Sequence, residues 1–202
     1  LLEPKVLTNA KRIDKDGEKP LDGFNRNENG TITDNLIIKG NNLLALHTLK
    51  EEFAGKIKLI YIDPPYNTGS DSFKYNDTFT ESTWLTFMHN RLKAAHSLLD
   101  KSGVLLVQIN DHNQIYLKIL LDEVFKKENF INIISIRTKS PSGFKTVNLG
   151  LFETAEYILM YGKSKNDFKY NPQYVDSGYD ENYTGYISNI TEDPESWIID
   201  DI

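Results

Sequence analysis

The chain has 202 residues with 39% hydrophobic and 26% charged side chains and a net charge of −6, a composition typical of globular domains rather than disordered proteins. No window of about 18 apolar residues is present and the N-terminus has no basic, apolar leader, so we expect neither a membrane segment nor a secretory signal. The chain contains no cysteine, which excludes disulfide scaffolds, zinc–thiolate sites and cysteine nucleophiles and fits a cytoplasmic protein.

The first segment, residues 1–33, is polar and rich in Lys, Asp, Asn and Gly without a sustained period, which predicts an extended arm or irregular wrap. It starts without Met, so we expect a piece excised from a longer protein. Short apolar runs then alternate with amphipathic stretches. The runs are β-branched or aromatic and bounded by polar residues, which predicts buried strands at 36–38, 57–62, 104–109, 131–136 and 157–161.

Apolar residues at spacings of three and four predict helices at 42–53, 83–99 and 115–125. Ser82 is a candidate cap for the second helix, residues 101–103 are expected to end it, and Asp111–His112 to cap the third. Strands alternating with helices indicate an α/β fold with a mostly parallel sheet. The last two runs have no helix between them, so they are expected to form an antiparallel pair at the C-terminal side.

Charge is distributed unevenly along the chain. The segment 164–202 holds 2 basic and 9 acidic residues, whereas the remainder is nearly neutral. The body of the protein is therefore not acidic. Overall charge nevertheless lends no support to a polyanionic partner.

The sharpest chemical feature is an acid, two prolines and an aromatic directly after the strand 57–62, as Asp63-Pro64-Pro65-Tyr66. Prolines cannot continue a strand ladder, so the chain leaves the sheet at its carboxyl edge, where ligands bind in α/β folds. The Asp63 carboxylate and the Pro64 carbonyl are acceptors for the two hydrogens of an exocyclic amine, and Tyr66 offers a stacking surface. Such acceptors would aim the amine lone pair at an electrophilic methyl group on a flipped-out base.

These residues carry a family resemblance. The run from Asp34 to Leu99, which contains DPPYNTG, resembles the modification subunits of type III restriction–modification systems, and so do GVLLVQIND and FKTVNLGLFETAEYILMYGK. That family consists of beta-class DNA adenine-N6 methyltransferases. The resemblance implies a Rossmann-like fold that uses S-adenosylmethionine, incomplete in this chain.

By the resemblance, the catalytic motif is Asp63, Pro64, Pro65 and Tyr66, and the active-site loop continues through the substrate-binding residues Asn67, Thr68 and Gly69. Gly40 and Asn41 correspond to a turn near the adenine of the cofactor, although many relatives have Asp in place of Asn41. An acid at the position of Asp63 favours adenine, because cytosine-N4 enzymes usually have Ser or Thr there and protein-glutamine methyltransferases Asn.

The family's Gly-rich cofactor turn is missing, since no two glycines stand two residues apart. In the beta class this turn follows the target-recognition region. We therefore divide the chain into an N-terminal arm (1–33), a catalytic subdomain (34–163) and the start of a target-recognition region or a partner-contacting segment (164–202). Alone, the chain is expected to bind cofactor poorly and to be inactive.

Three lysines are further candidates for substrate binding. Lys74 follows the catalytic loop among aromatic residues, where it either lines the base channel or belongs to a surface hairpin. Lys139 and Lys145 lie in a basic loop with Arg137 that either contacts the DNA backbone or is ordinary solvated charge. The four histidines lack the spacing of a ligand set, so no metal site is expected.

The favoured hypothesis is a site-specific DNA adenine-N6 methyltransferase. The alternatives are a cytosine-N4 methyltransferase with the same pocket and a non-catalytic module that binds DNA or a partner. The resemblance implies double-stranded DNA as substrate, a homodimer of the full-length subunit and a restriction subunit as partner, with no membrane contact.

Overall fold

The computed structural model describes residues 8–67, 80–138, 154–173, 185–189 and 193–201. The chain divides into two compact units, 1–169 and 170–202, and each is described by itself. None of the helices in the described residues combines the length and the apolar character needed to cross a membrane.

The first unit is built on a four-stranded sheet in the order β3-β4-β6-β5. Its strands are β3 (Ile57–Ile62), β4 (Leu99–Ile109), β5 (Phe130–Arg137) and β6 (Ala155–Gly162). β3 runs parallel to β4, and β6 is antiparallel to both β4 and β5. The α/β class and the antiparallel pair β5–β6 are confirmed. The described sheet is mixed, with a smaller parallel part than the pattern predicts, because β6 rather than a further parallel strand lies beside β4.

Three helices accompany the sheet: α1 (Asn42–Phe53), α2 (Glu81–Leu98) and α3 (Asp111–Phe125), with a short 3-10 turn, η1 (Lys127–Asn129), before β5. All three predicted helices are confirmed. Their capping residues differ from the prediction. Thr80 caps α2 in place of Ser82, and Asn110 caps α3, so that Asp111 is already the first helical residue.

The end of α2 also differs from the prediction. The helix ends at Leu98 and β4 starts at Leu99, so residues 101–103 belong to the strand. Gly103 explains why the strand extends so far. A Cβ atom there would lie 2.7 Å from the Ile57 carbonyl oxygen, so only glycine lets the start of β4 approach β3 this closely.

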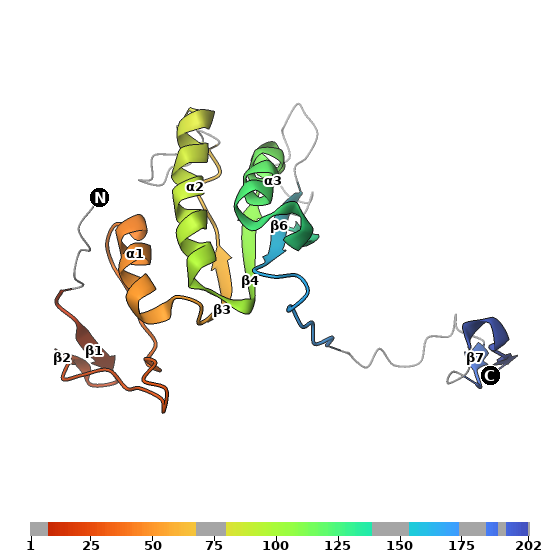
Figure 1. Cartoon of the computed structure of the whole chain (residues 1–202), viewed down its shortest axis with the longest axis horizontal. Coiled ribbons are helices and arrows are strands. Elements are labelled where there is room, and N and C mark those ends of the chain that lie inside the picture. The colour runs from red at the N-terminus through yellow and green to blue at the C-terminus, as the bar shows by residue number, and fades with distance from the viewer. Residues whose placement is uncertain (1–7, 68–79, 139–153, 174–184, 190–192, 202) are drawn as a thin grey trace, which may run out of the picture. The chain divides into compact units, whose positions relative to one another are not determined.

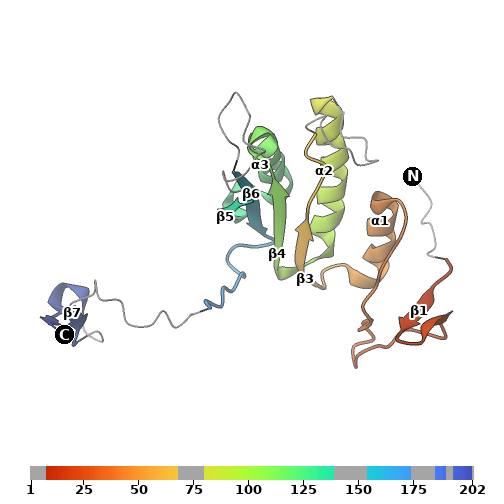
Figure 2. The ribbon, with the colours of Figure 1, turned by 180° about the vertical axis from the view of Figure 1, so that it is seen from behind.

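The core lies on one face of the sheet. α2 and α3 cover this face in Figure 1, and the view from behind in Figure 2 shows the strands from the opposite side. Alternate side chains of β4 point into the core and are fully buried, among them Leu105, Val107 and Ile109. The helices contribute Trp84 and Leu117, both fully buried as well.

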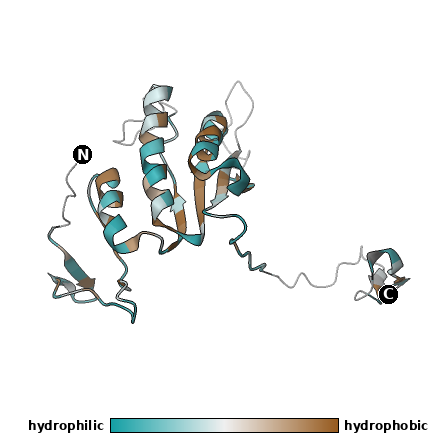
Figure 3. Cartoon of the chain, viewed as in Figure 1, coloured by the Kyte–Doolittle hydropathy of each residue, from teal (hydrophilic) through white to brown (hydrophobic). Residues whose placement is uncertain are grey.

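The opposite face of the sheet is partly open in the described residues. Leu59 and Tyr61 on β3 are 54% and 49% exposed, and Ile134 on β5 is 41% exposed. Figure 3 shows hydrophobic residues along the strands of this sheet and a more polar α2. A strand with two apolar faces is typical of a sheet that is covered on both sides.

The predicted strand at 36–38 is wrong. Ile37 is 92% exposed and no regular structure forms over 36–38. An apolar run becomes a strand only when a neighbour completes its hydrogen bonds. Within the described residues β3 is the edge strand on that side, and nothing pairs with 36–38.

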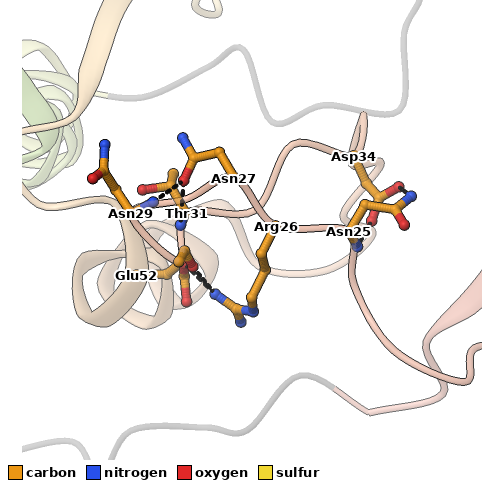
Figure 4. Close-up of polar contacts among 8 residues, drawn as sticks. Asn25, Arg26, Asn27, Asn29, Thr31, Asp34 and Glu52 are labelled. Atoms are coloured by element: carbon orange, nitrogen blue, oxygen red, sulfur yellow. Dashed lines mark hydrogen bonds and ion pairs between the residues drawn. The ribbon is translucent and has the colours of Figure 1, made fainter.

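The polar N-terminal segment has more structure than predicted. β1 (Lys11–Asp14) and β2 (Gly17–Pro20) form an antiparallel hairpin. Further on, Arg26 donates to the Glu52 carboxylate of α1 at 2.8 Å, as Figure 4 shows. The Asp34 carboxylate accepts from the Asn25 side chain at 2.7 Å. The contact with Glu52 ties the segment to α1, whereas the contact between Asn25 and Asp34 links two residues that precede the helix.

The second unit contains a short antiparallel pair, β7 (Gly185–Ile187) and β8 (Ile199–Asp201), with a 3-10 turn η2 (Pro194–Ser196) between them. The Asn189 side chain links the two ends by accepting from the Ile198 amide at 2.6 Å.

Candidate active site

The acid–proline–proline–tyrosine loop leaves the sheet at the carboxyl end of β3. Ile62, the last residue of β3, pairs with Val107 of the parallel neighbour β4. Asp63 follows directly and is exposed, whereas Tyr66 is half-buried against the core. The sequence prediction for the position of this loop is confirmed.

Two helices pin the loop through its carbonyl groups. The buried indole of Trp84 on α2 donates from Nε1 to the Pro65 carbonyl oxygen at 2.7 Å. The Asn113 side chain on α3 donates to the Tyr66 carbonyl oxygen. In the described part of the chain the Pro64 carbonyl has no donor of this kind. The loop therefore presents the Pro64 carbonyl and the Asp63 carboxylate as acceptors at the same strand end.

The Tyr66 side chain is held by a carboxylate from a distant part of the chain. Its hydroxyl donates to Oε2 of Glu156 on β6 at 2.8 Å. Burial of the ring raises the pKa of Tyr66 well above its ordinary value, and the Glu156 and Asp63 carboxylates raise it further. Tyr66 is therefore a neutral phenol at any physiological pH.

Glu156 belongs to a chain of hydrogen bonds that crosses three strands. Gln108 on β4 donates from Nε2 to Oε2 of Glu156. The Tyr61 hydroxyl on β3 donates to Oε1 of Gln108. The sequence analysis did not identify Tyr61, Gln108 or Glu156 as site residues. The available signal is a polar side chain inside an otherwise apolar strand, as Gln108 and Glu156 both are.

Asn67 directly follows the motif in a left-handed conformation, with φ at 55°. Asn tolerates this conformation better than most residues. The other predicted substrate-binding residues, Thr68, Gly69, Lys74, Lys139 and Lys145, lie outside the described residues. The structure therefore leaves their roles as predictions.

The predicted cofactor turn, Gly40 and Asn41, lies at the start of α1. The Asn41 side chain accepts from the amides of Leu43 at 3.0 Å and Leu44 at 3.3 Å, so it caps the helix. An amide oxygen used in this way has little capacity left for a ligand. With no Gly-rich turn among the described residues either, the residues at hand do not fit a complete S-adenosylmethionine site. The assignment of Gly40 and Asn41 to the cofactor stays a prediction.

Among the residues that the structure describes, no three His, Asp, Glu or Cys side chains gather as a metal-binding group. His96 illustrates a structural use of the imidazole. Its Nδ1 lies 3.1 Å from the Lys163 ammonium, and its ring packs edge-on against Phe125. Burial and the nearby Lys163 lower the pKa of His96, so this side chain is neutral at pH 7.

Comparison with known proteins identifies the family of the chain. The family model described as DNA methylase matches residues 57–199. The probable type III restriction-modification enzyme HindVI Mod subunit of Haemophilus influenzae is 45% identical over 98% of this chain and 26% of its own length. The EcoPI Mod subunit of Escherichia phage P1 is 32% identical, with 80% of this chain and 30% of its own length covered.

Solved structures give weaker likenesses. The M1.HpyAVI–SAM complex has a TM-score of 0.45 and 15% identity, with 68% of this chain and 61% of that chain covered. The cytosine-N4-specific PvuII DNA methyltransferase has a TM-score of 0.43 and 17% identity, with coverages of 62% and 48%. These scores carry no weight for the mechanism. The chain spans about a quarter of the HindVI and EcoPI subunits, between 26% and 30% of their lengths.

Proposed function

This chain belongs to the DNA methylase family, and from that premise we propose that its protein methylates the N6 amine of adenine in DNA. It is a homologue of the modification subunits of type III restriction–modification enzymes. We propose S-adenosylmethionine as the methyl donor, because the family resemblance implies it. The roles proposed for Asp63, Pro64 and Tyr66 do not depend on where the donor binds.

One observation carries the proposal: Asp63 and the Pro64 carbonyl remain as acceptors where β3 ends, while the neighbouring carbonyls are occupied. Trp84 takes the Pro65 carbonyl and Asn113 takes the Tyr66 carbonyl. An exocyclic amine has two hydrogens, and two fixed acceptors match them. Hydrogen bonds to both would favour a pyramidal nitrogen whose lone pair points away from the ring.

The target base must leave the duplex to reach this loop, because its amine is otherwise paired. Tyr66 is the stacking surface of the proposal. Its neutral hydroxyl is anchored at Glu156, so the ring is held at that end. The energy of such base–aromatic stacking is roughly 1–3 kcal/mol.

The partners of the proposal are those of a modification subunit: double-stranded DNA, a second copy of the full-length subunit and a restriction subunit. We propose a cytoplasmic location, where the DNA substrate would be accessible. These proposals concern the whole protein, of which this chain covers a part.

The test compares the gene product that contains this chain, at its natural length, with its Asp63→Ala variant. Both are incubated with S-adenosylmethionine and DNA of varied sequence, and the digested nucleosides are identified by mass spectrometry. We expect N6-methyladenine from the wild type and a loss of about a hundredfold or more in the variant, the size seen when one preorganised hydrogen-bonding group is removed. Asp22→Ala, which removes an exposed carboxylate in the N-terminal segment, serves as the control.

Each other outcome has a defined meaning. Methylcytosine from the wild type would replace adenine by cytosine-N4 as the target. An Asp63→Ala variant as active as the control would remove Asp63 from the mechanism. No methylated base from a folded protein would contradict the enzymatic proposal and leave a module that binds DNA or a partner.

A further inference from the structure

We propose that Glu156 is a positioning residue for the target base: it accepts the hydrogen bond of the Tyr66 hydroxyl and thereby leaves the Asp63 carboxylate to the amine. The inference rests on the proposed methyl transfer and adds to it a residue of β6, a strand that is separated from β3 by β4. The carrying observation is the hydrogen bond from the Tyr66 hydroxyl to Oε2 of Glu156, 2.8 Å long.

Asp63 and Glu156 compete for the hydrogen bond of the Tyr66 hydroxyl. Tyr66 lies close enough to both Asp63 and Glu156 for each carboxylate to raise its pKa. A phenol has a single proton to donate. In the structure the hydroxyl donates to Glu156 at 2.8 Å while Asp63 lies within hydrogen-bonding range of the same hydroxyl, so Glu156 draws the hydrogen bond away from the Asp63 oxygens. Without Glu156, the same hydroxyl would find its acceptor in Asp63, the group that the amine needs.

The position of Tyr66 is fixed by contacts from two other elements. Tyr66 lies in a loop beyond the end of β3, where strand pairing no longer holds the backbone. Two contacts replace it: Asn113 of α3 fixes the Tyr66 carbonyl, and Glu156 of β6 fixes the hydroxyl at the other end of the residue. A residue fixed at its carbonyl and at its hydroxyl loses little further conformational entropy when a base stacks on its ring.

The Glu156 side chain is itself held in one orientation by hydrogen bonds. Both Tyr66 and Gln108 donate to the same oxygen, Oε2. The Gln108 amide is in turn fixed, because its Oε1 accepts from the Tyr61 hydroxyl. The strand order β3-β4-β6 places these side chains next to one another across the sheet. Glu156 is thus a fixed acceptor and not a mobile surface carboxylate.

We expect the position of Tyr66 to depend on an acceptor oxygen within hydrogen-bonding distance of its hydroxyl, and less on the negative charge of Glu156. Glu156→Gln keeps an oxygen in the same place, so it should retain most of the activity. Glu156→Asp keeps the charge but is shorter by one methylene group, so it should not reach Tyr66. Glu156→Ala removes the acceptor altogether. Comparing the three variants separates reach from charge.

The experiment measures methyl transfer to DNA at steady state, with the gene product at its natural length. For Glu156→Ala and Glu156→Asp we expect kcat to fall roughly tenfold, the effect of losing one hydrogen bond to a charged group. The KM for DNA should change by less than about twofold, because phosphate contacts dominate DNA affinity. Glu156→Gln should stay within about threefold of the wild type, since a neutral hydrogen bond remains.

A double variant tests the competition directly. Tyr66→Phe removes the hydroxyl that would turn to Asp63, so the pair Glu156→Ala/Tyr66→Phe should be no slower than Glu156→Ala alone. Losses that multiply in the double variant would overturn the proposal. Wild-type kcat in Glu156→Asp would overturn it as well, and so would a Glu156→Gln variant as slow as Glu156→Ala.

Two controls keep the interpretation clear. Glu128→Ala removes an exposed carboxylate of η1 and should leave kcat unchanged. Thermal unfolding of every variant shows whether Glu156→Ala folds, and if it does not, Glu156→Asp and Glu156→Gln decide. An inactive wild type contradicts the proposed function, whereas an active wild type with an equally active Glu156→Asp contradicts only the role of Glu156.

Discussion

The single residue Asn41 has two candidate roles, cofactor binding and helix capping. The family resemblance assigns Asn41 to the cofactor turn. In the structure its side chain accepts from the amides of Leu43 and Leu44 and so satisfies the first turn of α1. Asn is among the best residues at this capping position. The capping role is a finding, and the role in cofactor binding stays a prediction.

The two roles predict different consequences of substitution. Asn41→Ala removes the cap, and we expect the free energy of unfolding to fall by about 1 kcal/mol. Asn41→Ser keeps a capping oxygen and should be as stable as the wild type. Urea unfolding followed by circular dichroism measures both. A Ser variant as unstable as the Ala variant would show that the amide does more than cap the helix.

The motif residues were found from the sequence because they are contiguous. Asp63 through Tyr66 form one run directly after a strand, so their neighbourhood is already given by chain order. Glu156 and Gln108 were missed because the chain separates them widely from Tyr66. Only the strand order β3-β4-β6 brings the three side chains together.

At the scale of elements, the junction between α2 and β4 depends on one glycine. A Cβ atom on Gly103 would lie 2.7 Å from the Ile57 carbonyl oxygen and 2.9 Å from that of Asp100. Both neighbours are backbone atoms, which cannot turn aside as a flexible side chain does. The start of the parallel pair β3–β4 depends on this close approach.

We therefore expect Gly103→Ala to lower the free energy of unfolding by roughly 1–3 kcal/mol, the usual cost of forcing extra volume into a packed site. Gly162→Ala is the matched control. Gly162 pairs with Val104 on the neighbouring strand, and a Cβ there would meet its nearest atoms at 3.4 Å. Denaturant unfolding of the two variants measures the difference. Equal losses would show that the contact with Ile57 is not what requires glycine.

The elements themselves were predicted well where hydrophobic period and length agree. The strand at 57–62 and the helix at 42–53 have the predicted bounds. The capping residues were not predicted correctly, because Ser82, Thr80 and Asn110 are all good capping residues and local sequence does not choose among them. The run 36–38 failed because an isolated apolar run says nothing about a partner strand.

At the scale of the whole molecule, the core of the first unit contains a buried tyrosine that is paired with a half-buried carboxylate. The Tyr161 side chain is fully buried, and its hydroxyl donates to the Asp122 carboxylate at 2.6 Å. Burial raises the pKa of Tyr161 above its ordinary value, and the Asp122 charge raises it further. The folded state therefore keeps this phenol neutral at a pH where the unfolded chain has begun to ionise.

The sign of the pH dependence follows from the raised pKa. The stabilisation is fully present below the unfolded pKa of about 10 and is lost as the pH rises further, by at most about 1.4 kcal/mol per pH unit. Tyr161→Phe has no ionisable hydroxyl and therefore lacks this pH-dependent contribution to the free energy of unfolding. We expect the stability advantage of the wild type over Tyr161→Phe to be constant from pH 7 to 9 and to shrink towards pH 11. Denaturant unfolding across that range measures it, and a constant difference up to pH 11 would contradict the assignment.

Residues that are neighbours along the chain encode the α/β class, the main strands and helices, and the loop that carries Asp63. Packing of the folded chain sets which loop carbonyls remain available, since Trp84 and Asn113 occupy two of them from different helices. It also decided that Glu156 anchors Tyr66. Such contacts depend on the order of strands in the sheet, and that order is set by packing over the whole core.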